Sequence, residues 1–71
     1  MGPATGVVVA FDAEKGYGTL RVDDPDGREL FFHCTRIADG SRRVDVGASV
    51  TFEIEAGQLG RWEATGLRPV R

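Results

Sequence analysis

KGYGTL at residues 15–20 and LFFH at residues 30–33 decide how this chain folds. Both stretches alternate in side-chain character with a period of two, which is typical of extended strands with one buried face. In this pattern Tyr17 points to one face of the first strand, and Phe31 and His33 share a face of the second. If the two strands pair through the turn between them, the three rings lie side by side. Exposed rings in this arrangement form a platform on which unpaired bases stack.

The opposite faces of the two strands carry only apolar side chains, namely Leu20, Val22, Leu30 and Phe32. An isolated aromatic residue on a strand is more often a core residue than a ligand contact. Because the opposite faces already supply a core, we predict that Tyr17 and Phe31 are exposed. His33 alone would indicate little. Its position beside Phe31 gives a stacking or hydrogen-bonding role equal weight with a structural one.

Cationic side chains accompany the rings and suit a phosphate backbone. Lys15 precedes Tyr17, and Arg21 extends the same face of the first strand. A guanidinium pairs with phosphate and also stacks on a base. Single cations are more often solvated than bound, so we rank Lys15 and Arg21 above the others. The remaining arginines near the rings or in loops are Arg36, Arg42, Arg43 and Arg61.

The rest of the chain continues the strand pattern, with a last turn at about residues 56–60. A strong turn signal, DPDG, occupies residues 24–27. A polar loop at about residues 38–46 is placed to border a ligand groove. No amphipathic helical stretch of useful length occurs, and we predict a single domain over residues 1–71. The predicted strands lie at about residues 5–11, 17–22, 29–34, 49–55 and 62–67.

The order of these motifs resembles the bacterial cold-shock proteins. GVVVAFDAEKGYG at residues 6–18 and LFFHCTRI at residues 30–37 match that family's first and second RNP motifs. Residues 46–54 and 60–70 look like its fourth and fifth strands, so the resemblance covers nearly the whole chain. It implies an all-β fold, a small five-stranded antiparallel barrel of OB type, that binds single-stranded RNA and also DNA with low sequence specificity. By the same resemblance the chain would act as an RNA chaperone or a regulator of transcription or translation.

The chain departs from the family pattern where that family stacks bases. Of the usual stacking set, only Tyr17, Phe31 and His33 carry over by position. Each stacked base is worth about 1–3 kcal/mol, so the loss of two at the low end weakens binding roughly thirty-fold. Here Val9 and Ala10 stand where the family usually has a Lys-Trp pair. Thr19 and Cys34 stand where it usually has phenylalanine, and Ser41 where it has an aromatic residue in the following loop.

The last hairpin offers a replacement for the lost contacts. Arg61 and Trp62 follow Gly60 where the family usually has a short Gly-Pro segment, and Trp62 is the only tryptophan. We hypothesise that both supply a relocated contact to nucleic acid. The equally weighted alternative is that Trp62 caps the barrel. Phe11 adjoins both core and platform, and we expect it to lie nearer to the core.

The overall charge does not indicate a nucleic-acid binder. The formal net charge is −2 and the pI is near 5.2, so bulk attraction to phosphate is weak and a local patch must hold the ligand. Acidic residues gather at residues 23–26 and at Glu53 and Glu55. The alternative function is a protein-interaction barrel that has lost most nucleic-acid affinity, with a smoother and less basic platform.

Catalysis and metal binding find little basis in the sequence. His33 and Cys34 are adjacent, so on a strand their side chains would point to opposite faces and form neither a dyad nor a metal site. Asp24 and Asp26 lack the further ligands of a calcium loop. We therefore expect no enzyme activity, no metal and no cofactor. One cysteine and no long apolar stretch favour a cytoplasmic protein, with a monomer favoured over a dimer.

Overall fold

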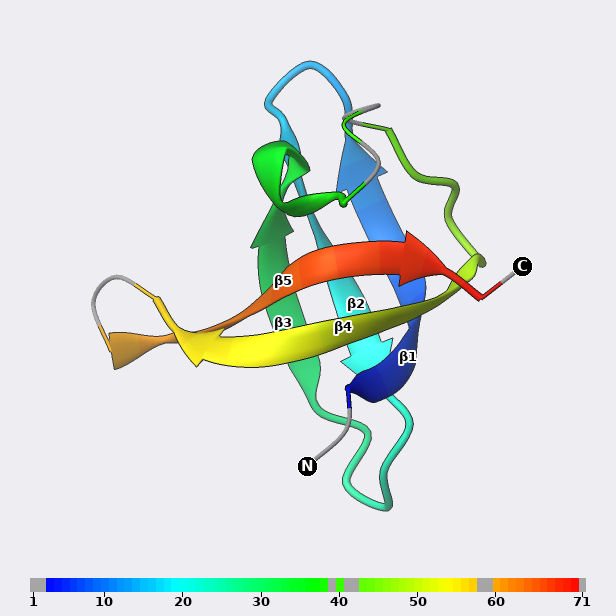
Figure 1. The fold of residues 1–71 in the computed structure, drawn as a ribbon, viewed down its shortest axis with the longest axis vertical. Coiled ribbons are helices and arrows are strands. Elements are labelled where there is room, and N and C mark those ends of the chain that lie inside the picture. The colour runs from blue at the N-terminus through cyan, green and yellow to red at the C-terminus, as the bar shows by residue number, and fades with distance from the viewer. Residues whose placement is uncertain (1–2, 39, 41–42, 58–59, 71) are drawn as a thin grey trace.

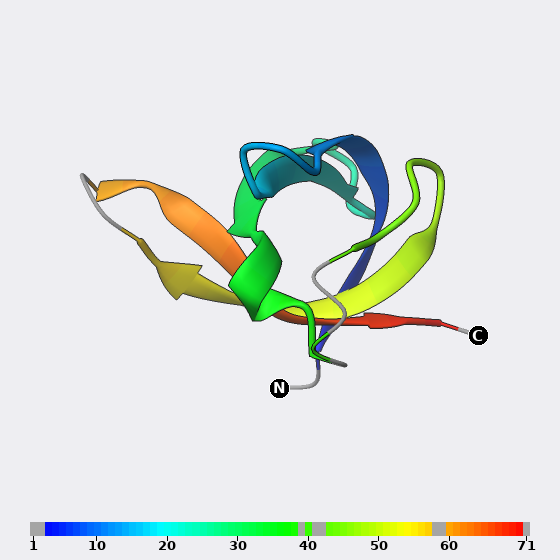
Figure 2. The ribbon, with the colours of Figure 1, turned by 90° about the horizontal axis from the view of Figure 1, so that it is seen from above.

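Five strands close into a barrel in the computed structural model, which describes residues 3–38, 40, 43–57 and 60–70. Neighbouring strands follow the order β1-β2-β3-β5-β4 and then return to β1. In Figure 1, β4 and β5 cross the sheet formed by the first three strands, and Figure 2 shows the strands curving round one centre. The elements are β1 (Ala4–Asp12), β2 (Tyr17–Val22), β3 (Glu29–His33), the 3-10 helix η1 (Cys34–Arg36), β4 (Ser49–Ala56) and β5 (Trp62–Pro69).

All five predicted strands are confirmed, and the third ends one residue earlier than expected. Cys34 begins η1, and His33 is the cap residue before it. Four of the strand contacts are antiparallel, and the barrel closes through a parallel contact in which Phe31 of β3 pairs with Glu63 of β5. A second parallel bridge joins Ile37 to Leu67. The chain after η1 is thereby tied to β5.

The core is formed by one face of every strand. On β2 and β3 the buried residues alternate with exposed ones, as the period-two pattern predicted. Val50 and Phe52 of β4 are likewise buried. No helix in the described part of the chain is long and apolar enough to cross a membrane. The buried apolar side chains are Val8, Leu20, Val22, Leu30, Phe32, Ile37, Val50, Phe52, Ala64 and Leu67.

β1 and β2 lie unusually close together at Gly18 of β2. The register shifts between Val8 and Ala10, which is the signature of a β-bulge. A Cβ at Gly18 would overlap the Ala10 carbonyl oxygen and the edge of the Phe32 ring. Glycine is therefore required at position 18 for β1 to pair this closely with β2.

The DPDG turn between β2 and β3 folds as predicted. The Gly27 N–H donates to the Asp24 carbonyl oxygen at 3.1 Å and to its carboxylate Oδ1 at 2.7 Å. Gly27 has a φ of +61°, which favours glycine. Burial raises the Asp24 pKa, but hydrogen bonds from Gly27 and Arg28 outweigh this effect, so the net pKa is lower than usual. The turn sets the register of the two strands that carry the rings.

Candidate nucleic-acid interface

Pairing of β2 with β3 brings the three predicted rings onto one outward face. Tyr17 pairs with His33, and Thr19 pairs with Phe31 on the next rung of the same face. The Tyr17 residue is 42% exposed and Phe31 is 38% exposed, so neither is a core residue. Their ring centroids lie 6.2 Å apart with planes at 87°, an edge-to-face contact. We call this set of three rings the platform.

His33 has a structural contact as well as an exposed position on the platform. Its Nδ1 accepts a hydrogen bond from the Thr35 N–H at 3.3 Å and lies 3.0 Å from the Thr35 hydroxyl oxygen. These contacts cap η1 and fix the imidazole at the end of β3. A ring fixed in this way loses little conformational freedom when a base stacks on it.

The expectation that His33 and Cys34 point to opposite faces was wrong. The Cys34 Sγ lies 4.0 Å from the His33 Nδ1. The physical reason is that Cys34 begins η1, so the side-chain alternation of β3 ends at His33. Within the described residues, no group of three or more histidine, cysteine or acidic side chains is placed to hold a metal ion.

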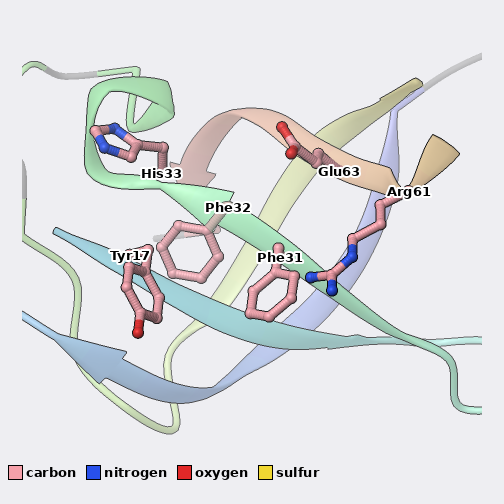
Figure 3. Close-up of a pocket in the computed structure, with 6 residues that line it drawn as sticks. All are labelled: Tyr17, Phe31, Phe32, His33, Arg61 and Glu63. Carbon is pink, nitrogen blue, oxygen red and sulfur yellow. The ribbon is translucent and has the colours of Figure 1, made fainter. Parts of the chain in front are cut away.

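Arg61, which we ranked low, lies directly at the platform. Its Cζ is 5.2 Å from the centroid of the Phe31 ring, within the range of a cation–π contact. Figure 3 shows the guanidinium beside the ring. The platform opens into a shallow recess of about 370 Å³. The recess is lined by Tyr17, Phe31, Phe32, His33, Arg61 and Glu63.

The two cations that we ranked highest lie at the margins of this face. Arg21 is one rung beyond Phe31, and its Nη2 lies 3.5 Å from Oε2 of Glu29. Lys15 is exposed in the turn before Tyr17, and its backbone N–H donates to the Asp12 carboxylate at 3.0 Å. Neither residue lines the recess.

The other singled-out arginines have different surroundings. The Nη2 of Arg36 lies 3.6 Å from Oε2 of Glu55, and an exposed ion pair of this kind is worth little. Arg43 is exposed in the loop between η1 and β4. Arg42 and Ser41 lie outside the described residues. Arg61 therefore stands out by its contact with a platform ring, that of Phe31.

Trp62 is exposed at the start of β5 and does not seal the barrel. It is 58% exposed and pairs with Ala56 near the end of the β4–β5 hairpin. A groove of about 610 Å³ adjoins the recess between this hairpin and β3. Phe31 and Arg61 line both hollows, and Trp62 lines the groove. A strand of nucleic acid that leaves the platform in this direction would therefore meet a further ring.

Two of the positions that lack the family's rings, Ala10 and Thr19, lie together on the other side of the platform. Ala10 of β1 pairs with Thr19 of β2, and Thr19 pairs with Phe31 of β3. Here the surface forms a hollow of about 180 Å³. As expected, Phe11 lies nearer to the core, half-buried and stacked on Phe32 with centroids 5.9 Å apart. The rings of the platform are thus concentrated toward β3 and β5.

Glu63 was not predicted as a site residue. It is half-buried on β5 and pairs with Phe31 across the parallel contact that closes the barrel. Local alternation places Glu63 on a strand but does not reveal which strand lies beside β5. Only the barrel topology indicates that this carboxylate borders the platform.

Comparison with known proteins agrees with this geometry. The family model described as the 'Cold-shock' DNA-binding domain matches residues 4–70. "Cold shock protein" of Arthrobacter globiformis is 43% identical over 65 residues, which span 90% of this chain and 94% of that protein. "Cold shock-like protein CspE" of Bacillus anthracis is 40% identical over 57 residues, covering 79% of this chain and 82% of that protein. "Cold shock protein ScoF" of Streptomyces coelicolor is 41% identical over 58 residues, which span 80% of this chain and 85% of that protein.

Proposed function

The chain belongs to the cold-shock domain family, and from this membership we propose that it binds single-stranded RNA and single-stranded DNA with low sequence specificity. Binding without consumption of nucleotide keeps transcripts unfolded or adjusts their transcription and translation. The protein then acts as an RNA chaperone or regulator and not as an enzyme. We further propose that residues 1–71 act as one domain, as a monomer in the cytoplasm.

The observation that carries this proposal is the exposure of three rings on one face of two paired strands. Tyr17, Phe31 and His33 form this platform on β2 and β3, while the opposite face supplies the core. Flat exposed rings bind unpaired bases without regard to sequence, because every base has a π-face. Bases in a duplex are already stacked on one another, so the platform favours single strands.

Arg61 and Trp62 are proposed to replace part of the stacking surface lost on β1 and β2. The Arg61 guanidinium already lies over Phe31, so it can stay against a base that stacks there or pair with the adjoining phosphate. Trp62 supplies the next ring along the groove. The nucleic acid would then run from the platform toward the β4–β5 hairpin.

Local cations compensate for the acidic overall balance in this proposal. Lys15 and Arg21 lie at the two ends of the β2 face and would contact the backbone on either side of the rings. The Arg21 ion pair with Glu29 is exposed and weak, so exchange for a phosphate costs little. With few phosphate contacts, we expect modest affinity that falls as salt rises.

A titration of labelled short oligonucleotides, followed by fluorescence anisotropy at two salt concentrations, tests the proposal. We expect saturable binding with Kd in the range of roughly 10⁻⁴–10⁻⁶ M at physiological salt, weakened at higher salt. Simultaneous replacement of Phe31 and His33 by alanine should abolish it, while the matched control Val70→Ala, exposed and outside the recess, should not. Absence of binding would contradict the proposal, and a partner protein retained after nuclease treatment would then favour a protein-interaction barrel.

A further inference from the structure

We propose that Glu63 is a specificity-determining residue, which favours bases with N–H donors on their pairing edge, guanine above all, over uracil and thymine. The inference rests on the proposed function, because it concerns a base stacked on the same platform. It adds a preference at one position to a surface whose stacking is otherwise indifferent to sequence.

The position of Glu63 makes it the acidic residue of the recess. It pairs with Phe31 across the β3–β5 contact, and both side chains line the recess together with His33. Figure 3 shows Glu63 on β5, across the recess from the rings of β2 and β3. A base that stacks between these elements directs a polar edge toward β5. On β5 the side chain that lines the recess is Glu63.

The Glu63 carboxylate is available to a ligand. Within residues 3–38, 40, 43–57 and 60–70, three acidic residues form ion pairs with arginines, and Glu63 is not one of them. The Arg61 guanidinium, two residues earlier and just before β5, lies over Phe31 instead. No side-chain hydrogen bond to Glu63 occurs in this part of the chain. A half-buried carboxylate without partners gains most from donors that a ligand brings.

The Glu63 side chain packs against Gly57, the residue that follows β4. The Gly57 N–H donates to the Arg61 carbonyl oxygen at 2.6 Å, which closes the β4–β5 hairpin. A Cβ at position 57 would overlap the Cγ, Cδ and Oε2 atoms of Glu63. The carboxylate therefore rests on a surface that only glycine leaves open. Addition of one methyl group there displaces the carboxylate without changing its charge.

The chemistry of the base edges sets the order of preference. Guanine presents its N1–H and N2–H groups side by side, which match the two oxygens of a carboxylate. Cytosine and adenine each offer one amino group on this edge. Uracil and thymine offer one N–H between two carbonyl oxygens, which a carboxylate repels. A bidentate pair discriminates by roughly 5- to 150-fold, and we expect the low end, about fivefold, because the recess is open to water.

The same carboxylate also constrains the path of the backbone. A phosphate beside Glu63 would be repelled, so the backbone passes on the side of Arg61 and Arg21. Base edges then face β5 while phosphates face the arginines. The acidic residue thus orients the strand in addition to selecting a base.

The test compares a short all-uracil oligonucleotide with the same oligonucleotide carrying one central guanine, by anisotropy at one fixed salt concentration. We expect the wild-type protein to bind the guanine-containing strand about fivefold more tightly. Glu63→Gln should remove most of this ratio, mainly by weakening the binding of the guanine-containing strand. Gly57→Ala should also reduce the ratio with the charge retained. The control Glu53→Gln, which removes the same charge from an exposed position outside the recess, should leave the ratio unchanged.

Three results would overturn the inference, and two of them spare the proposed function. If the wild-type protein binds both strands with equal affinity, or if Glu63→Gln keeps the full ratio, Glu63 does not select the base although the platform binds. If neither strand binds, the proposed function fails and the inference fails with it. Circular dichroism of each variant verifies that the barrel is folded before its ratio is interpreted.

Discussion

Replacement of Phe31 by alanine is the most informative single change to the platform. Phe31 occupies the middle rung, with the edge of Tyr17 on one side and the guanidinium of Arg61 on the other. Its neighbours across β2 and β1 are Thr19 and Ala10, which carry no ring to take over. The variant therefore loses a full stacking contact, worth about 1–3 kcal/mol, or roughly 5- to 150-fold in Kd.

Binding is measured by the anisotropy of a labelled oligonucleotide. Intrinsic fluorescence is less suitable, because Trp62 lines the same groove as Phe31 and its emission would respond to the substitution itself. Phe31→Leu is the matched variant, because it keeps an apolar side chain but removes the flat ring. It should lose nearly as much affinity as alanine if stacking, not apolar burial, holds the base. A Kd of the Phe31→Ala variant within twofold of the wild-type Kd at the same salt concentration would refute a stacking role for Phe31.

Stability separates this effect from unfolding. Phe31 is 38% exposed, so its truncation should lower the free energy of unfolding by only about 1–2 kcal/mol. Phe32, the next residue, is 1% exposed at the centre of the core. Phe32→Ala should cost about 3–5 kcal/mol and unfold much of so small a barrel. Thermal unfolding of both variants by circular dichroism tests this contrast.

Three further predictions follow from contacts of single residues. Arg61→Ala should weaken binding and reduce the slope of log K against log salt by about 0.7, as expected for one lost phosphate contact on a single strand. In the same titration the control Arg68→Ala, at an exposed position of β5 outside the recess, should leave the slope unchanged. Gly18→Ala should destabilise the barrel by about 1–3 kcal/mol, because its Cβ overlaps a carbonyl of β1; a melting temperature unchanged from wild type would contradict this. The folded-state pKa of Asp24 lies below its ordinary value, so its contribution to stability is present above that value of 3.8 and is lost as pH falls through the lower folded pKa. Asp24→Asn should therefore lower the melting temperature at neutral pH and have a smaller effect in strong acid. An effect of equal size at both pH values would contradict a stabilising role for the Asp24 contacts with Gly27 and Arg28.

The strands were predictable because one face of each is buried. On β2 and β3 a shift by one residue would expose Leu20 and Phe32 and bury Arg21, so the alternation alone determines which side faces the core. The DPDG turn then fixes the pairing register, because its hydrogen bonds and the positive φ of Gly27 leave little choice of geometry. Exposure of Tyr17 and Phe31 follows from these two local facts.

The contributions of β5 to the site were not predictable by the same reasoning. Glu63 of β5 and Arg61, which immediately precedes that strand, border the platform only because β5 lies parallel to β3. This contact joins segments about thirty residues apart, and no local pattern encodes it. Arg61 was ranked low for this reason, and Glu63 was not considered. The relation of Cys34 to His33 was misjudged for a local reason, since the capping contacts of His33 with Thr35 end the strand alternation.

Single-stranded nucleic acid is proposed to bind on the platform and its extension toward β5. Backbone amide chemical shifts of the isotope-labelled protein, measured by NMR with and without a saturating uracil-rich oligonucleotide, test it most directly. We predict the largest shift changes at Tyr17, Phe31, His33, Arg61 and Trp62, and little change at Glu53 and Arg68 on the outer faces of β4 and β5. Changes concentrated at Glu53 and Arg68, or no change at saturation, would contradict the account.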